Sequence, residues 1–252
     1  FALSGGSWSQ QAKIQASDPE GNDQFARYVS MNSDGTRVLV GAHKKDSLAG
    51  AAYIFALSSG SWSQEAKIQA SDKQNNDSFG HGVSMSSDGT RVLVGAYQED
   101  TGASDAGAAY IFALSGGSWS QEAKIQASDL QASDYFGVSV SMSGDGTRVI
   151  VGAWFEDTGA SAAGSAYIFA LSGGSWSQQA KIVASDPEAS DYFGYSVSMS
   201  SDGTRVLVGA YNEDTGGTDA GAAYIFEAST LLALTSSTLI SAAGTTLSFT
   251  GQ

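Results

Sequence analysis

Short runs in which large hydrophobic residues alternate with small or polar ones recur along the chain and predict β-strands. In one stretch they are FGVSVSM at Phe136–Met142, RVIVGA at Arg148–Ala153, AYIFAL at Ala166–Leu171 and WSQQAKIVA at Trp176–Ala184. Alternation with a period of two places one set of side chains on each face of a strand. Asp-Gly between the first two runs is typical of a tight hairpin turn. No run has helical periodicity over a useful length, so we predict an all-β fold.

The same four runs repeat along the chain. The tryptophans that open the last run, Trp8, Trp62, Trp119 and Trp176, are 54, 57 and 57 residues apart. The difference of three residues falls in one segment, where HKKDSLAG at 43–50 replaces YQEDTGASDAG at 97–107. Loops absorb changes in length and strands do not, so this segment is a surface loop. Four antiparallel strands per repeat predict the four-stranded blades of a β-propeller.

Composition narrows the classes of protein to consider. The 252 residues are 42% hydrophobic, which is enough for a folded core, and they carry a formal net charge of −14. This charge disfavours nucleic acid and anionic membranes as partners. No stretch of about 18 apolar residues predicts a membrane span. Cysteine is absent, which excludes disulfides, thiol catalysis and thiolate metal sites.

Two dipeptides recur in the repeats and carry a resemblance to a known family. Phe-Gly stands at 79–80, 136–137 and 193–194, Phe25-Ala26 departs from it, and Gly-Ala stands at 41–42, 95–96, 152–153 and 209–210. His43, Tyr97, Trp154 and Tyr211 follow the Gly-Ala pairs, where the family has proline. The sequence resembles FG-GAP repeats, which form propellers in integrin α-chains and in many secreted bacterial proteins. The resemblance implies a β-propeller in an extracellular or cell-surface protein, although fold does not dictate activity.

The resemblance also implies that the Phe-Gly strand is innermost in a blade and the tryptophan strand outermost. Blades then start near residues 25, 79, 136 and 193, and the propeller occupies residues 1–228. The fourth blade has three strands of its own, so we expect the N-terminal strand, residues 8–16, to complete it and close the ring. Two alternatives remain open: the segment belongs to a longer array of blades, or two chains build an eight-bladed ring.

The last part of the chain, residues 229–252, leaves the repeat. It is uncharged, rich in Ser and Thr, and composed of residues that favour strands. An uncharged segment of this kind is prone to aggregate unless it is paired. We therefore expect a tail or linker that has a partner, and self-assembly can use either this tail or the N-terminal strand.

Acidic residues gather in two sets of loops that the blade topology places on one face. These loops hold 19 of the 26 acids, and Ca²⁺ takes six to eight oxygen ligands. Ca²⁺ is thus the only cofactor that the sequence suggests, and its candidate ligands are Glu99, Asp100, Asp105, Glu156, Asp157, Glu213, Asp214 and Asp219. The alternative is that these residues form turns in solvated loops. No loop has the D-x-[DN]-x-[DN]-G spacing of a strong calcium motif.

Aromatic residues lie beside the acidic loops. Tyr97, Trp154, Phe155 and Tyr211 are candidates for a ligand or partner surface, because aromatic rings with nearby acids suit sugar faces and protein partners. Packing between neighbouring blades is the alternative. One inner-strand position also varies, as Arg27, His81, Val138 and Tyr195. It can line the central channel as a small asymmetric site, and relaxed packing at the channel mouth is the favoured alternative.

No arrangement of residues predicts catalysis. His43 and His81 occupy different repeat positions and have no Ser or Cys partner at a recognisable spacing. The acids recur around a ring, whereas catalysis needs one asymmetric pocket. We therefore expect a non-enzymatic, extracellular or surface module for interaction or assembly, which binds a protein or glycan on the acidic loop face. The alternatives are a Ca²⁺-dependent glycan-binding propeller, a subunit of a surface filament that exchanges strands between protomers, and a hydrolase that uses a pair of acids.

Overall fold

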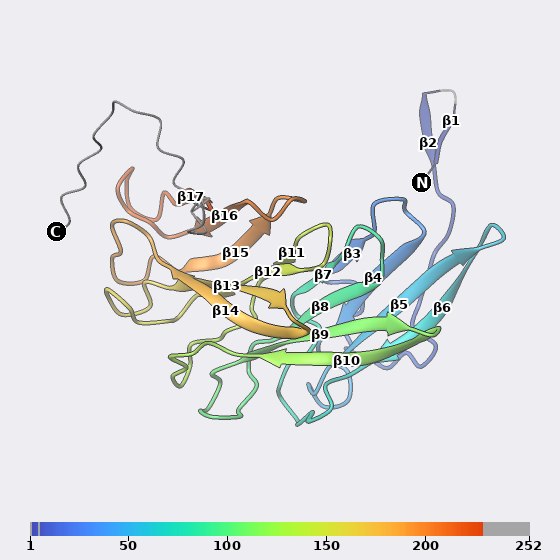
Figure 1. Cartoon of the computed structure of the whole chain (residues 1–252), viewed down its shortest axis with the longest axis horizontal. Helices are drawn as coiled ribbons and strands as arrows, with labels where there is room; N and C mark the ends of the chain where they lie inside the picture. The colour runs from blue at the N-terminus through green and yellow to red at the C-terminus, as the bar shows by residue number, and fades with distance from the viewer. Residues whose placement is uncertain (1, 5, 229–252) are drawn as a thin grey trace, which may run out of the picture.

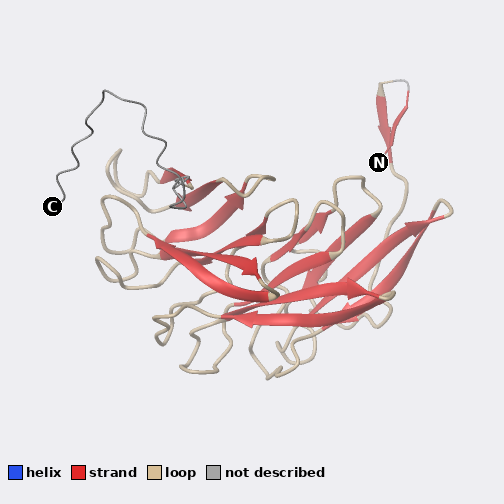
Figure 2. Ribbon diagram, viewed as in Figure 1, coloured by secondary structure: helices blue, strands red, loops and turns tan. Residues whose placement is uncertain are grey.

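The computed structural model describes residues 2–4 and 6–228, and every regular element in these ranges is a β-strand (Figures 1 and 2). Four sheets of antiparallel strands follow one another along the chain, and we call them blades one to four. Blade one contains β3 (Val29–Met31), β4 (Arg37–Ala42), β5 (Ala51–Ser58) and β6 (Ser61–Ile68). Blade two contains β7 (Val83–Met85), β8 (Arg91–Ala96), β9 (Ala108–Ser115) and β10 (Ser118–Ile125). Blade three contains β11 (Val140–Met142), β12 (Arg148–Ala153), β13 (Ser165–Ser172) and β14 (Ser175–Ile182). Blade four contains β15 (Phe193–Met199), β16 (Arg205–Ala210) and β17 (Ala222–Glu227).

The predicted all-β fold of four-stranded blades is confirmed, but the inner strand of blades one to three is shorter than the sequence predicts. β11 begins at Val140 rather than at Phe136. Phe136 instead forms a parallel bridge with Gly107 of the preceding blade. The next residue, Gly137, has a φ of +97°, a region that favours glycine. In blades two and three the Phe-Gly dipeptide thus joins neighbouring blades instead of extending the inner strand, whereas in blade four Phe193 both bridges to Gly164 and begins β15.

The hydrophobic core lies between neighbouring blades. Between blades one and two, Leu39 and Ile54 pack with Phe79, Met85 and Tyr110, all of them buried. Equivalent residues build the cores between blades two and three and between blades three and four. Each blade therefore presents two different apolar faces, and each junction buries one face of each kind. Stability in such an array resides largely in the contacts between neighbours.

The four blades form an open arc in the structure (Figure 1). The inner strands β3, β7, β11 and β15 contact one another in that order. At the blade-one end, Val29 and Met31 are 63% and 57% exposed, and at the blade-four end Leu207 and Ile225 are 44% and 74% exposed. The equivalent residues at the three internal junctions are buried or half-buried. The two end faces therefore do not pack on each other.

The N-terminal segment lies against blade one and does not complete blade four. β2 (Ser7–Ser9) pairs with β1 (Ala2–Ser4), whereas β17 pairs only with β16 among the described residues. Ile14 and Ala16 pack against the core of blade one. The closure expected from residues 8–16 is not formed in this structure, because blade four lies at the other end of the arc (Figure 1). Residues 229–252, for which the sequence predicts a partner, lie outside the described residues.

Candidate functional site

The acidic loops are built around a lysine, a tyrosine and two carboxylates that repeat from blade to blade. In blade two, Lys124 Nζ lies 2.7 Å from Asp72 Oδ2 and 2.9 Å from Glu99 Oε1. Tyr110 donates a hydrogen bond of 2.9 Å to Asp72. Glu99 is fully buried, so its charge is balanced by the lysine rather than by water. Blade three repeats the arrangement with Lys181, Asp129, Glu156 and Tyr167.

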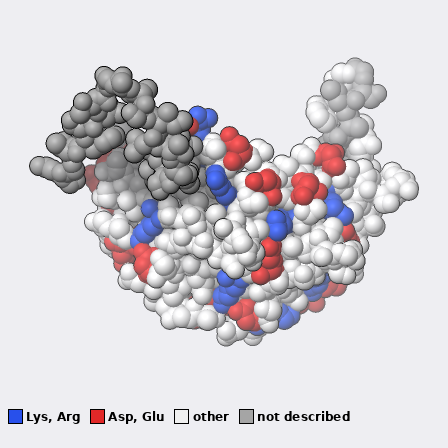
Figure 3. Space-filling view, viewed as in Figure 1, with Lys and Arg blue, Asp and Glu red and all other residues white. Residues whose placement is uncertain are grey.

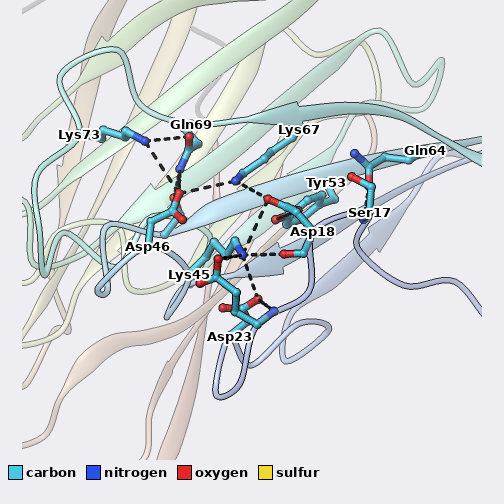
Figure 4. Close-up of polar contacts among 12 residues, drawn as sticks. Ser17, Asp18, Asp23, Lys45, Asp46, Tyr53, Gln64, Lys67, Gln69 and Lys73 are labelled. Atoms are coloured by element: carbon cyan, nitrogen blue, oxygen red, sulfur yellow. Dashed lines mark hydrogen bonds and ion pairs between the residues drawn. The ribbon is translucent and has the colours of Figure 1, made fainter.

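Blade one reverses the charge at the buried position of this network. Lys45 stands where blades two to four have glutamate, and its side chain is 1% exposed. Its Nζ lies 3.0 Å from Glu20 and 3.5 Å from Asp23 and donates a hydrogen bond of 2.6 Å to the Asp18 carbonyl (Figure 4). The substitution of lysine for glutamate is thus matched by acids from the preceding connection. The loop of blade one is held by internal ion pairs, as are those of blades two and three.

The residues predicted to bind Ca²⁺ lie in these loops, but the structure does not bring them together around one point. Glu99 and Glu156 form ion pairs with Lys124 and Lys181. Glu213 accepts a hydrogen bond of 2.8 Å from the Thr215 N–H. Asp100, Asp157 and Asp214 accept backbone hydrogen bonds of 2.7, 2.8 and 2.6 Å from Asp105, Ala162 and Asp219. Among the described residues, no group of three or more His, Cys, Asp or Glu side chains is placed to hold a metal ion. The geometry favours the alternative interpretation, in which these carboxylates close the loops.

A second set of carboxylates precedes the inner phenylalanine of each blade, and its burial was not predicted from the sequence. Asp77 is 1% exposed and Asp134 is 4% exposed. Each accepts a backbone hydrogen bond, from Gln74 at 2.6 Å and from Gln131 at 2.7 Å. Burial raises the pKa of both carboxyl groups to about 6. The available signal is an aspartate two residues before every inner phenylalanine.

Charges elsewhere on the surface are mixed rather than uniformly acidic (Figure 3). Arg37 pairs with Glu65 at 2.9 Å and Arg91 pairs with Glu122 at 2.8 Å, in both cases between strands of one blade. These pairs are partly exposed, so each contributes little to stability. The net charge of −14 therefore coexists with local neutralisation of many acids.

The four aromatic residues predicted as a partner surface belong to one continuous cluster, which we call the aromatic band. The rings of Trp154 and Phe155 are 4.6 Å apart. Tyr135 links Tyr97 to Trp154, at 5.8 and 6.0 Å. Tyr192 links Phe155 to Tyr211, at 5.3 Å from each, and Tyr195 lies 5.3 Å from Trp154 and 4.7 Å from Tyr211. The aromatic band therefore comprises Tyr97, Tyr135, Trp154, Phe155, Tyr192, Tyr195 and Tyr211.

The aromatic band is most exposed at its blade-four end. Tyr195 and Tyr211 are each 46% exposed, and the other rings of the band are half-buried. Tyr135 and Tyr192 were not predicted from the sequence as members of this surface. Each stands directly before an inner phenylalanine, and their φ angles are +54° and +58°. Their positive φ follows from the turn that precedes each Phe-Gly pair and is not visible in the local hydrophobic pattern. The band thus combines packing between blades with an open surface.

The variable inner-strand position lies at a central pocket of about 270 Å³ to which all four blades contribute. His81, Val138 and Tyr195 line this pocket, and blade one supplies Tyr28 instead of Arg27. Tyr28 Oη and His81 Nε2 are 2.9 Å apart. Burial lowers the pKa of the neighbouring His43 to about 4, and its ring lies 5.3 Å from that of His81. Both histidines are therefore packed among aromatic rings.

Comparisons with known sequences identify the repeat. Residues 8–55, 62–112, 119–169 and 176–226 match the family described as FG-GAP repeat. Each match runs from an outer-strand tryptophan to the third strand of the following blade, so the family unit spans a junction between blades. No curated protein matches the chain. No helix within residues 2–4 and 6–228 is long and apolar enough to cross a membrane.

Solved structures resemble the chain in fold at low sequence identity. TolB from Acinetobacter baumannii is 16% identical, with a TM-score of 0.47 over 81% of this chain and 41% of that chain. Hydrazine synthase from Kuenenia stuttgartiensis is 13% identical, with a TM-score of 0.51 over 86% of this chain and 49% of that chain. The present chain spans less than half the length of either, and the likeness concerns the fold alone. The four family matches cover most of the sequence, and the chain therefore belongs to the FG-GAP repeat family.

Proposed function

We propose that this protein is a non-enzymatic β-propeller interaction module that binds its partner through the aromatic band. The observation that carries the proposal is the continuity of the band, in which seven rings from blades two to four contact one another in series. Rigid aromatic side chains supply a large contact area at low cost in conformational entropy. FG-GAP repeats are typical of extracellular and surface proteins, which supports an extracellular or surface location for this one.

The non-enzymatic part of the proposal is supported by how the titratable groups are used. The buried carboxylates Glu99 and Glu156 are paired with lysines. Asp77 and Asp134 accept backbone hydrogen bonds in separate blades. His43 and His81 are packed against each other and against tyrosines. Structural partners thus account for the groups that general acid–base catalysis would need.

Glycan binding is the second candidate, and the exposed end of the aromatic band favours it. Tyr195 and Tyr211 present half-exposed rings, on which the apolar face of a sugar can stack. Burial, followed by the charges of Tyr192, Tyr195 and Asp219, raises the pKa of Tyr211, and Asp219 belongs to the loop that follows this tyrosine. A carboxylate beside an exposed ring can accept hydrogen bonds from sugar hydroxyls. In the Ca²⁺-dependent form of this alternative, EDTA abolishes glycan binding.

The test is a binding screen of the full chain on arrays of immobilised oligosaccharides and of peptides, with and without EDTA. We expect Tyr195→Ala/Tyr211→Ala to weaken binding of every hit at least tenfold, because the two most exposed rings of the band are removed. Leu57→Ala is the matched control, since Leu57 is an exposed apolar residue on a strand of blade one. Equal losses in the two variants, or hits that neither variant changes, would contradict the proposal.

A further inference from the structure

We propose that a second copy of this chain docks on the open end of the blade stack, where its residues 8–16 add a fourth strand to blade four. The contact is head-to-tail, so it closes into a ring or continues as a chain of copies. The proposal concerns the two end faces of the arc. The exposed rings of Tyr195 and Tyr211 also lie at the blade-four end, so a docked copy adjoins that end of the aromatic band. Four independent features of those faces support it.

The N-terminal segment already sits on blade one as the outer strand of a preceding blade would. Ile14 and Ala16 pack on blade one at the repeat positions that Ile68 and Ala70 occupy on blade two. The Ser17 N–H donates a hydrogen bond of 2.9 Å to Gln64 (Figure 4). Equivalent bonds of 3.0 Å join Ser71 to Gln121 and Ser128 to Gln178. Residues 8–16 thus occupy the place of the outer strand of a preceding blade. Another copy can supply the other three strands of that blade.

Blade four has the tyrosine and the aspartate that pair with an outer-strand lysine in the other blades, but it does not have the lysine. Tyr224 donates a hydrogen bond of 2.9 Å to Asp186, as Tyr53 does to Asp18 and Tyr110 to Asp72. Lysines pair with the equivalent aspartates at 2.6 to 2.8 Å, in the pairs Lys67–Asp18, Lys124–Asp72 and Lys181–Asp129. Lys13 stands at the same repeat position, is exposed, and has no ion pair in the described part of the chain. Lys13 of a second copy therefore matches Asp186 and the buried Glu213, which stand at the repeat positions of Asp72 and Glu99.

A hollow of about 550 Å³ lies where the outer-strand tryptophan of blade four would pack. Ile182, Val206 and Phe226 are among the residues that line it. Their equivalents Ile68, Val92 and Phe112 form the core between blades one and two, against which Trp119 packs. Trp8 is the tryptophan of the N-terminal segment and is 69% exposed. The docked strand would bury Trp8 in this hollow.

The occupant is a second copy because the internal junctions leave the two ends of one copy apart. Backbone hydrogen bonds of 3.0, 2.8 and 2.7 Å join Ser33 to Ser87, Ser87 to Gly144 and Gly144 to Ser201, at the same turn of successive blades. The three junctions are therefore alike. With this geometry Met31 at the blade-one end is 57% exposed and Ile225 at the blade-four end is 74% exposed. A closed ring of four blades would have to alter all three junctions. A second copy extends the series without altering any of them.

Two single residues determine how closely the copies can approach. A Cβ atom at Gly95 or Gly152 would overlap a backbone carbonyl oxygen of the next blade. At the equivalent Gly209, the nearest atom to an added Cβ would be the oxygen of the Ser196 hydroxyl, which can rotate away. A Cβ atom at Gly80 would lie 2.5 Å from a carbonyl oxygen of the preceding blade, and blade one has Ala26 at this position. The contact between copies is therefore looser than the internal junctions. Gly209→Ala would block it and Ala26→Gly would tighten it.

The experiment is light scattering of the full chain over a concentration series without added ligand. We expect association beyond the chain mass of 25.8 kDa, at twice this mass for a closed ring and at higher multiples for a growing chain. Gly209→Ala and Lys13→Glu are expected to raise the dissociation constant at least tenfold, and Ala26→Gly to lower it. Gly21→Ala is the matched control, because a Cβ at Gly21 meets no atom within 4 Å.

Far-UV circular dichroism of each variant shows that a loss of association is not a loss of fold. A wild-type chain that stays at 25.8 kDa at all concentrations would overturn the proposal. Association that Gly209→Ala and Lys13→Glu leave unchanged would overturn it equally, because it would take place through another surface. Since no ligand is present, this experiment measures association between copies and not the binding of a partner by the aromatic band.

Discussion

The buried aspartates predict a specific pH dependence of stability. Asp77 and Asp134 have a pKa of about 6 in the folded protein, against 3.8 for an ordinary aspartate. Between these two values the folded state holds protons that the unfolded state has lost, so the free energy of unfolding falls as the pH rises. From pH 5 to pH 7.5 each carboxyl group then lowers the free energy of unfolding by about 1.4 kcal/mol. The two together lower it by about 3 kcal/mol.

Histidine opposes this trend in the wild-type protein. The pKa of His43 falls from 6.5 to about 4 on folding, so below pH 6.5 the unfolded state takes up a proton that the folded state does not. Stability therefore falls as the pH drops from 6.5 toward 4. The aspartate contribution is isolated by comparing the wild type with Asp77→Asn/Asp134→Asn, since the histidines are the same in both. Asparagine keeps an oxygen that can accept the backbone hydrogen bonds from Gln74 and Gln131.

The assay is urea unfolding at pH 5.0 and pH 7.5, followed by tryptophan fluorescence. We expect the stability of the double variant relative to wild type to be about 3 kcal/mol greater at pH 7.5 than at pH 5.0. Asp202→Asn is the control, because hydrogen bonds to Ser200 and Thr204 hold the pKa of Asp202 at about 2, outside this range. A relative stability that is the same at both pH values would refute the argument that these two carboxyl groups are protonated near pH 6.

Two further predictions concern the acidic loops. Lys124→Met leaves the buried Glu99 carboxylate without its cation, so we expect a loss of about 3 kcal/mol of stability and a melting temperature lower by roughly 6 to 12 °C in calorimetry. Lys44→Met, at an exposed lysine without an ion pair in the described residues, should change it by less than about 2 °C; equal shifts would argue against a buried ion pair. Adding Ca²⁺ and then EDTA should leave the melting temperature of the wild type unchanged, since no three ligating side chains of the described residues are placed around one point; a rise with Ca²⁺ that EDTA reverses would support the metal hypothesis.

The sequence predicts strands well where hydrogen bonds run within one blade. β12 (Arg148–Ala153) has the predicted bounds, and β13 (Ser165–Ser172) extends the predicted run by one residue at each end. Alternation with a period of two and Asp-Gly turns are local features, so they can be read without knowledge of neighbours. The aromatic residues Tyr97, Trp154 and Tyr211 could likewise be identified because they follow a repeated Gly-Ala pair.

Features that depend on contact between blades could not be predicted in the same way. Phe136 is followed by a residue with positive φ and bridges to the preceding blade, so the strand predicted from it begins later. The burial of Asp77 and the pairing of Lys45 with acids of the preceding connection arise from the junction, not from local pattern. The expected closure by residues 8–16 assumed that four blades complete a circle. The angle between blades, which decides this, has no local signature in the sequence.

The most direct test of the account is an indole N–H spectrum of the ¹⁵N-tryptophan-labelled protein, recorded with the oligosaccharide or peptide that binds best on the arrays. The chain has five tryptophans, of which Trp154 alone belongs to the aromatic band and the other four open outer-strand segments. If the band is the binding surface, the ligand shifts the Trp154 signal and leaves those of Trp62, Trp119 and Trp176 in place. A ligand that shifts these outer-strand signals and not that of Trp154 would contradict the proposed function.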